Sequence, residues 1–179
     1  MTHYRAQSYV QWFEEIGRGD LALAGGKGAN LGVLAHAGLP VPPGFVVTTA
    51  AYRALTDDAE IQELIERLDS LDTADADALT TTAAEIRGLI QNRSFDEPAE
   101  RAITDALDSD AETGTTYAVR SSATAEDLPT ASFAGQHDTH LGVPADDVVD
   151  RIRDCMASLF TDRAVAYRAR NDIAHSTVE

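Results

Sequence analysis

Lysine is almost absent from this chain of 179 residues. Of its 14 basic residues 13 are arginine and one is lysine, Lys27, whereas Asp and Glu together number 30. The resulting net charge of −16 argues against nucleic-acid and membrane-surface partners, because both require basic clusters that neutralise phosphate. A composition that avoids lysine elsewhere makes Lys27 a candidate for chemistry.

Cysteine, aromatic residues and long apolar runs are scarce as well. The single cysteine, Cys155, excludes an internal disulfide, fits a reducing cytoplasm, and lies on an apolar helix face where we expect core packing. Aromatic residues make up 6% of the chain, so the core must consist mainly of Leu, Ile, Val and Ala. No run approaches the ~20 apolar residues of a membrane span, and the N-terminus lacks a signal pattern. These absences predict a cytoplasmic protein.

The acidic residues belong to a folding sequence, since 44% of the chain is apolar and the apolar positions are periodic. Asp outnumbers Glu 19 to 11, which together with the lack of lysine indicates adaptation to a saline cytoplasm. Repulsion between surface carboxylates is largely screened at about 1 M salt, where the Debye length is ~3 Å. The alternative is an acidic protein from an ordinary cytoplasm.

Apolar periodicity predicts a single helix-rich domain of the α+β class. Residues 57–109 carry three apolar stripes at helical spacing, interrupted by an acidic loop at 72–78. Further helices are predicted for residues 27–37 (ended by Gly38), from Thr48 or Thr49 to about Leu55, and for 144–160 and 162–171. Three β-prone runs, 45–47, 117–120 and 139–143, predict one small sheet.

Residues 25–30, with the sequence GGKGAN, lie at the start of the predicted helix and have the character of a phosphate site. The first N–H groups of a helix lack intrahelical acceptors, glycines allow an anion to come close, and Lys27 adds a full positive charge. The segment is not a Walker A loop, because Gly28 follows the lysine where Ser or Thr is required, nor a dinucleotide fingerprint. The alternative is a glycine-rich turn with a surface lysine.

Residues 120–136 form a second candidate segment, small, polar and aperiodic. Arg120 stands at the end of a predicted strand, where its guanidinium can bind two phosphate oxygens. Hydroxyl side chains follow it, and a long loop of this kind is usually functional or disordered. The alternative is a polar surface loop.

Taken together, these segments resemble one enzyme family. Residues 25–32, 38–45, 119–136 and 157–164 are similar to the N-terminal nucleotide-binding domain of phosphoenolpyruvate synthase, whose signature pyruvate phosphate dikinase and rifampicin phosphotransferase share. The resemblance implies an ATP-grasp fold and transfer of phosphate from ATP to a histidine, then to pyruvate or another acceptor. It covers nearly the whole chain and is weakest in 57–112.

The resemblance also implies roles for individual residues. Lys27 and Arg120 match the family's catalytic, phosphate-binding cations, and residues 121–136 match the loop that closes over the nucleotide. The ATP-binding residues expected on this basis are Gly26, Lys27, Gly28, Arg120, Ser121, Ser122, Thr124, Gly135 and Gln136. Val33 and His140 depart from common family residues without removing the phosphate site.

The length indicates an incomplete enzyme. Residues 1–179 correspond to the first ATP-grasp subdomain, so the acidic Mg²⁺ ligands, the phosphohistidine domain and the pyruvate-binding barrel are expected on a second polypeptide. The alternatives are a non-catalytic nucleotide-binding or regulatory remnant and, for the acceptor, a rifampicin-type antibiotic.

Two further patterns favour structural roles. His137 and His140 would point to opposite faces of a strand, so no metal site is predicted in this chain. The arginines of the C-terminal helices are expected to form salt bridges on helix surfaces, with an interface to the missing half as the alternative; they are Arg151, Arg153, Arg163, Arg168 and Arg170.

Overall fold

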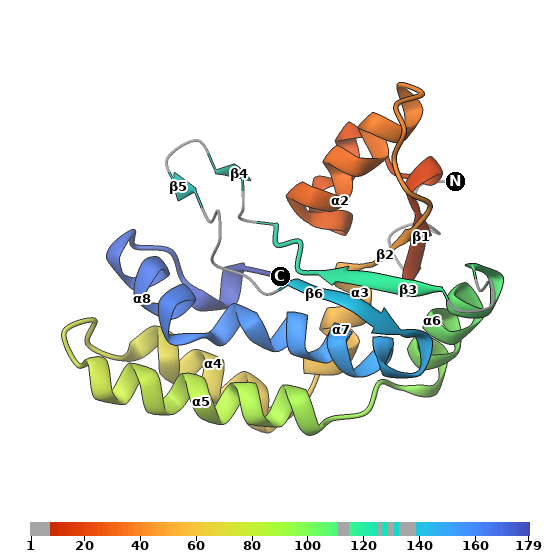
Figure 1. Ribbon diagram of the computed structural model, residues 1–179. Helices are drawn as coiled ribbons and strands as arrows, with labels where there is room; N and C mark the ends of the chain where they lie inside the picture. The colour runs from red at the N-terminus through yellow and green to blue at the C-terminus, as the bar shows by residue number, and fades with distance from the viewer. Residues whose placement is uncertain (1–7, 111–114, 125–126, 129–130, 133–138) are drawn as a thin grey trace.

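A computed structural model describes residues 8–110, 115–124, 127–128, 131–132 and 139–179. It confirms the predicted helix-rich α+β class (Figure 1). The α-helices are α2 (Leu21–His36), α3 (Thr49–Thr56), α4 (Ala59–Ser70), α5 (Ala76–Asn92), α6 (Glu97–Asp110), α7 (Val148–Ala157) and α8 (Asp162–Arg170). The 3-10 turns are η1 (Phe13–Glu15), η2 (Arg18–Asp20), η3 (Ala145–Asp147), η4 (Ser158–Phe160) and η5 (His175–Thr177).

The strands form separate two-stranded antiparallel ribbons, so the expectation of one sheet is wrong. They are β1 (Val10–Trp12), β2 (Phe45–Val47), β3 (Thr116–Arg120), β4 (Asp127–Leu128), β5 (Ala131–Ser132) and β6 (Thr139–Pro144). Two of the three predicted runs do lie together, because β3 pairs antiparallel with β6. However, β2 pairs with β1. There the rings of Trp12 and Phe45 pack edge to face, with their centroids 5.5 Å apart. A three-residue apolar run fits any free strand edge, so its pattern does not specify a partner.

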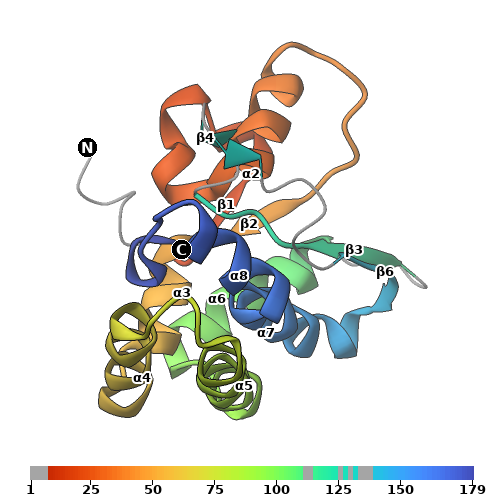
Figure 2. The same cartoon turned by 90° about the vertical axis from the view of Figure 1, so that its left-hand side faces the viewer.

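Helices α7, α5 and α4 lie in layers beneath the β3–β6 ribbon, whereas α2 lies above it (Figures 1 and 2). The ribbon packs on α7, and α7 and α8 pack in turn on α5, which lies beside α4. The predicted apolar stripes form this core, since Ile61, Ile86, Ile90 and Ile103 are all completely buried. Among the helices of the described residues, none is both long and apolar enough to cross a membrane.

Side-chain caps set the helix starts. The Thr48 hydroxyl accepts a hydrogen bond from the Ala50 N–H at 3.3 Å, so the predicted cap of α3 is confirmed. The Asp75 carboxylate accepts from the Ala78 N–H at 3.0 Å and starts α5 inside the predicted acidic loop. These caps divide the region 57–109 into separate helices without breaking its continuous core.

The C-terminal arginines fall into two groups. Arg151 pairs with Asp154 and Arg153 with Asp150 on α7, as predicted. Arg168 differs, because it is completely buried beneath the C-terminal residues instead of bridging charges on a surface.

The buried Arg168 holds the C-terminal tail. Its Nε donates to His175 Nδ1 at 2.9 Å, and its Nη2 donates to the Leu159 carbonyl at 2.5 Å. The Asp69 carboxylate on α4 accepts from the backbone N–H of His175 at 2.5 Å and from that of Ser176 at 3.2 Å. The tail is therefore fixed to α4 and α8 together.

This contact predicts an acid-sensitive tail. Burial, and then the positive charge of Arg168, lower the pKa of His175 from 6.5 to about 4, although Asp69 opposes the shift. Because the unfolded chain binds the extra proton more readily, the stability from neutral His175 is present above pH 6.5 and lost as pH falls towards 4. Between pH 7.5 and 4.5, thermal unfolding should show a steeper loss of stability in the wild type than in His175→Gln. Parallel profiles would contradict this assignment.

Candidate functional site

Gly25 divides α2 into two helical pieces. Its backbone has φ 66° and ψ 176°, so a helical N-terminus begins at Gly26, one residue before Lys27. The helix as a whole starts at Leu21, earlier than predicted, but the predicted terminus at the glycine-rich segment is confirmed. Gly38, with φ 71°, follows the other end as the expected left-handed stop.

The segment after β3 lies against this terminus. The Gly26 N–H donates to the Ala123 carbonyl at 3.2 Å. The Gly28 N–H donates to the Ser122 hydroxyl at 3.0 Å, and that hydroxyl donates to the Ala24 carbonyl at 2.8 Å. Two segments that are nearly 100 residues apart in sequence are thereby joined in one structure, which we call the Ser122 joint.

The joint leaves no room for side chains at two of the glycines. A Cβ atom on Gly25 would lie 2.0 Å from the Ser122 carbonyl oxygen, and one on Gly28 would lie 2.9 Å from Val46 Cγ2. From sequence, these glycines were expected to let an anion come close. In the structure Gly25 allows close approach of the Ser122 backbone, and Gly28 allows close approach of the Val46 side chain.

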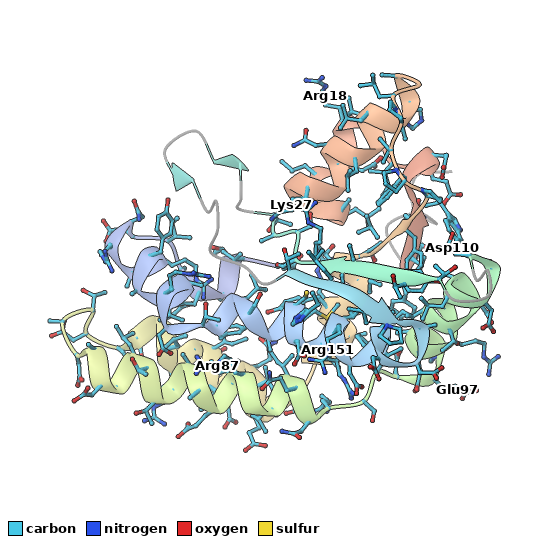
Figure 3. All side chains as sticks on the ribbon, viewed as in Figure 1. Arg18, Lys27, Arg87, Glu97, Asp110 and Arg151 are labelled. Carbon is cyan, nitrogen blue, oxygen red and sulfur yellow. The ribbon has the colours of Figure 1, made fainter. Side chains whose placement is uncertain are left out.

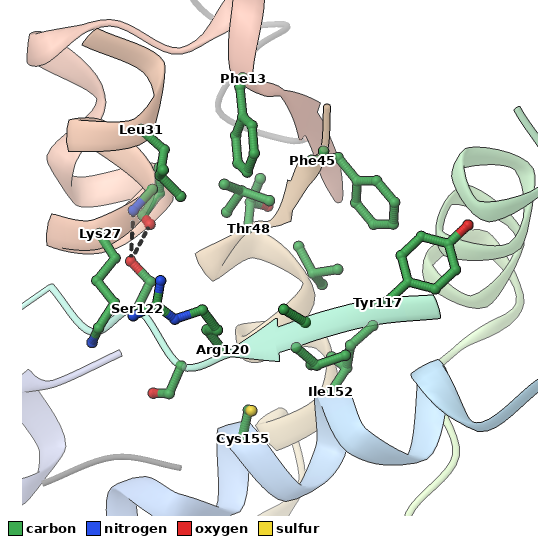
Figure 4. A pocket seen from close by; sticks show the side chains of 18 of the residues that line it. Phe13, Lys27, Leu31, Phe45, Thr48, Tyr117, Arg120, Ser122, Ile152 and Cys155 are labelled. Carbon is green, nitrogen blue, oxygen red and sulfur yellow. Dashed lines mark hydrogen bonds between the residues drawn. The ribbon is translucent and has the colours of Figure 1, made fainter. Parts of the chain in front are cut away.

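A cleft of about 580 Å³ opens beside the joint, between α2 and β2 on one side and β3 and α7 on the other. Lys27 and Arg120 both line it, one from each side of the joint. Figure 4 shows their side chains on either side of Ser122. The remaining walls are largely apolar and include Phe13, Leu31, Phe45, Tyr117, Ile152 and Met156.

The two cations differ in exposure. Lys27 is half-buried, whereas Arg120 at the end of β3 is exposed to solvent. Elsewhere in the cleft, burial, and then the charges of Asp110 and Asp108, raise the pKa of Tyr117. The cleft thus combines a cationic edge with apolar walls, an arrangement suited to a ligand with a phosphate group and a flat apolar ring system.

Comparison with known proteins identifies the family. Residues 21–179 match the family described as pyruvate phosphate dikinase, AMP/ATP-binding domain. The chain belongs to this family. The resemblance drawn from its motifs is therefore confirmed.

Curated relatives are similar along nearly the whole chain. A probable phosphoenolpyruvate synthase of Methanothermobacter thermautotrophicus is 47% identical over 95% of this chain and 26% of its own length. A probable phosphoenolpyruvate synthase of Methanocaldococcus jannaschii is 45% identical over 97% of this chain and 15% of its own. A rifampicin phosphotransferase of Streptomyces sviceus is 47% identical over 96% of this chain and 20% of its own. The chain thus spans about a quarter or less of these relatives' lengths.

Within this AMP/ATP-binding domain, the predicted ligands fall into different positions. Ser121 is buried and lines the cleft, and Ser122 forms the joint. The hydroxyl and N–H of Thr124 contact Glu179 instead. Gly135 and Gln136 lie outside the described residues.

The apolar walls of the cleft were not predicted from the sequence. Phe45 was assigned only to a strand and Tyr117 only to a β-prone run, yet both face the cleft (Figure 4). The Pro-Pro-Gly turn at residues 42–44 was the sequence signal that could have indicated these walls, because it carries the chain directly from the cleft rim into β2. Cys155 is buried, as predicted, and lines the cleft from α7.

Metal ligands form a separate question. In the part of the chain that the structure describes, no group of three or more His, Cys, Asp or Glu side chains could hold a metal ion.

Proposed function

We propose that this domain binds ATP for phosphotransfer in a phosphoenolpyruvate synthase-like system, with the triphosphate held at the Ser122 joint. The observation that supports the proposal is that Lys27 and Arg120, the cations matching the family's phosphate-binding residues, line one cleft in an AMP/ATP-binding domain. Phosphoryl transfer depends mainly on positioning and on neutralising charge spread over phosphate oxygens. Two cations beside a helix N-terminus can contribute to both.

Different residues of the cleft would contact different parts of the nucleotide. Arg120 can donate two parallel hydrogen bonds to phosphate oxygens, while Lys27 acts as a compact point charge. The apolar walls would exclude water from one face of the adenine ring. Residues 121–136 would cover the bound nucleotide, with Ser121 as a hydroxyl donor; Gly135 and Gln136 belong to this part of the proposal.

The remaining parts of the proposal concern what lies outside this domain. We infer an ATP-grasp site completed by a second polypeptide, which would carry the acidic Mg²⁺ ligands and the phosphohistidine domain. The similarity to phosphoenolpyruvate synthases favours pyruvate as the acceptor, and the similarity to a rifampicin phosphotransferase makes an antibiotic the alternative. The acidic composition supports a saline cytoplasm as the working environment.

Calorimetric titration with Mg-ATP in molar KCl tests the proposal. The chain is measured alone and mixed with a candidate second half, taken as the part of the Methanothermobacter relative that follows the matched region. Binding only in the mixture is the expected result and supports a split site. Binding by the chain alone would favour the non-catalytic nucleotide-binding alternative, and no binding in either sample would contradict the proposed function.

A further inference from the structure

The last residue of the chain is tied directly to the segment that forms the joint. The Thr124 N–H donates to the Glu179 carbonyl at 2.9 Å, and the Glu179 N–H donates to the Thr124 hydroxyl at 3.3 Å. Thr124 is two residues from Ser122, so the tail contacts the joint from the side opposite α2. Figure 1 shows the C-terminus beside the end of β3.

The Glu179 side chain is held in turn by helix α3. Arg53 donates from Nε to Glu179 Oε1 at 2.6 Å and from Nη2 to Oε2 at 2.5 Å. This two-bond geometry fixes the direction of both groups, which a single contact between point charges does not. The hydrogen bonds to Glu179 hold the pKa of Arg53 above its usual value.

Helix α3 closes the circuit back to α2. The hydroxyl of Thr49, at the first turn of α3, donates to the Ala22 carbonyl in α2 at 3.0 Å. The contacts therefore run from α2 to α3, from α3 through Arg53 to Glu179, from Glu179 to Thr124, and through the Ser122 joint to α2 again. A closed ring of contacts fixes the N-terminus of the Lys27 helix.

The C-terminal tail is itself held by buried contacts, so it can take part in this ring of contacts. Val178 is buried, and His175 is fixed by Arg168 and Asp69 as described above. Residues 121–124, by contrast, belong to no helix or strand. Ordering such backbone loses conformational entropy, so contacts on both of its sides are needed to hold one conformation.

We propose that Thr124, Glu179 and Arg53 are positioning residues that hold the Ser122 joint in the geometry that binds the triphosphate. This inference rests on the proposed function of Lys27 and Arg120. Thr124, which was expected among the ATP ligands, would instead orient the joint through its contact with Glu179. The Arg53–Glu179 pair is partly exposed, with 55% of the Arg53 side chain accessible, so its removal should alter global stability little.

The test measures nucleotide affinity and local order together. Thr124→Val removes the hydroxyl at nearly constant volume, Thr124→Ser restores it, and Arg53→Ala removes the grip on Glu179. Arg101→Ala is the matched control, because Arg101 forms an exposed ion pair with Glu97 on α6, away from the ring. Each is titrated with Mg-ATP in the sample, chain or mixture, in which the wild type binds, and its amide hydrogen exchange is recorded.

Thr124→Val and Arg53→Ala should each weaken Mg-ATP binding roughly three- to tenfold, the range that corresponds to the net contribution of a hydrogen bond or of a partly exposed ion pair. Exchange of the Gly28 and Thr124 amides should accelerate by a similar factor. Thr124→Ser should restore both, Arg101→Ala should change neither, and the double variant should show less than the sum of the single effects.

The outcomes separate this inference from the proposed function. A wild type that fails to bind Mg-ATP overturns the proposed function and this inference with it. A wild type that binds, together with Thr124→Val and Arg53→Ala variants of unchanged affinity, overturns only the inference. Faster exchange in those variants without weaker binding also overturns it, since the ring would then be structural alone.

Discussion

Replacement of Lys27 or Arg120 by alanine is expected to abolish measurable Mg-ATP binding in the reassembled protein. Both side chains line the cleft beside Ser122, and each would lose charge-assisted hydrogen bonds to phosphate. Such bonds contribute about 1.5–3 kcal/mol each, or roughly 10- to 150-fold in Kd. Calorimetric titration in molar KCl measures the loss directly.

A matched control removes a cation outside the cleft. Arg18 lies in the exposed turn η2, at the far side of α2 from Lys27 (Figure 3). Arg18→Ala changes the net charge by the same amount as Lys27→Ala or Arg120→Ala. Because exposed charges are screened at this salt concentration, the Kd of this variant for Mg-ATP should stay within about twofold of the wild-type value. Wild-type affinity in both Lys27→Ala and Arg120→Ala would refute the proposed phosphate site.

Replacement of Gly25 by alanine should be among the most damaging single changes in the domain. The backbone conformation there, φ 66° with ψ 176°, suits glycine alone, and the new Cβ would lie 2.0 Å from the Ser122 carbonyl oxygen. Strain and overlap together should cost about 2–6 kcal/mol. Urea unfolding in molar KCl measures the stability, and Mg-ATP titration of the surviving fold should show weakened binding.

Gly38→Ala separates the two causes. Gly38 also has a positive φ of 71°, but a Cβ atom there would meet nothing within 4 Å. This variant should lose only about 1–2 kcal/mol, the cost of a left-handed backbone, and should keep the wild-type affinity. Equal losses in both variants would show that the contact with Ser122 contributes nothing.

The helices could be predicted from sequence because their apolar positions repeat over many residues. The α4, α5 and α6 stripes extend over three turns or more, and tertiary packing agrees with them. The strands could be located but not paired correctly throughout. β2 has three residues and pairs with β1, because contacts distant in sequence decide the partner of so short a strand.

The site was predicted in outline. The charged residues Lys27 and Arg120 stood out because they sit in glycine- and serine-rich surroundings, and the structure brings them to one cleft. The roles of the small residues were harder to predict. Glycine at position 25 signals a close approach, but only the fold shows that the approaching atom belongs to Ser122. Thr124 and Glu179 meet only because the tail returns across α4 and α8, a contact that no local pattern contains.

Two residues that line the cleft can serve as reporters of its two walls. Lys27, the sole side-chain amine of the sequence, and Cys155, its sole thiol, line the same cavity from α2 and α7. Selective isotope labelling of lysine and cysteine would therefore place one reporter on each wall of the cleft without any engineered residue.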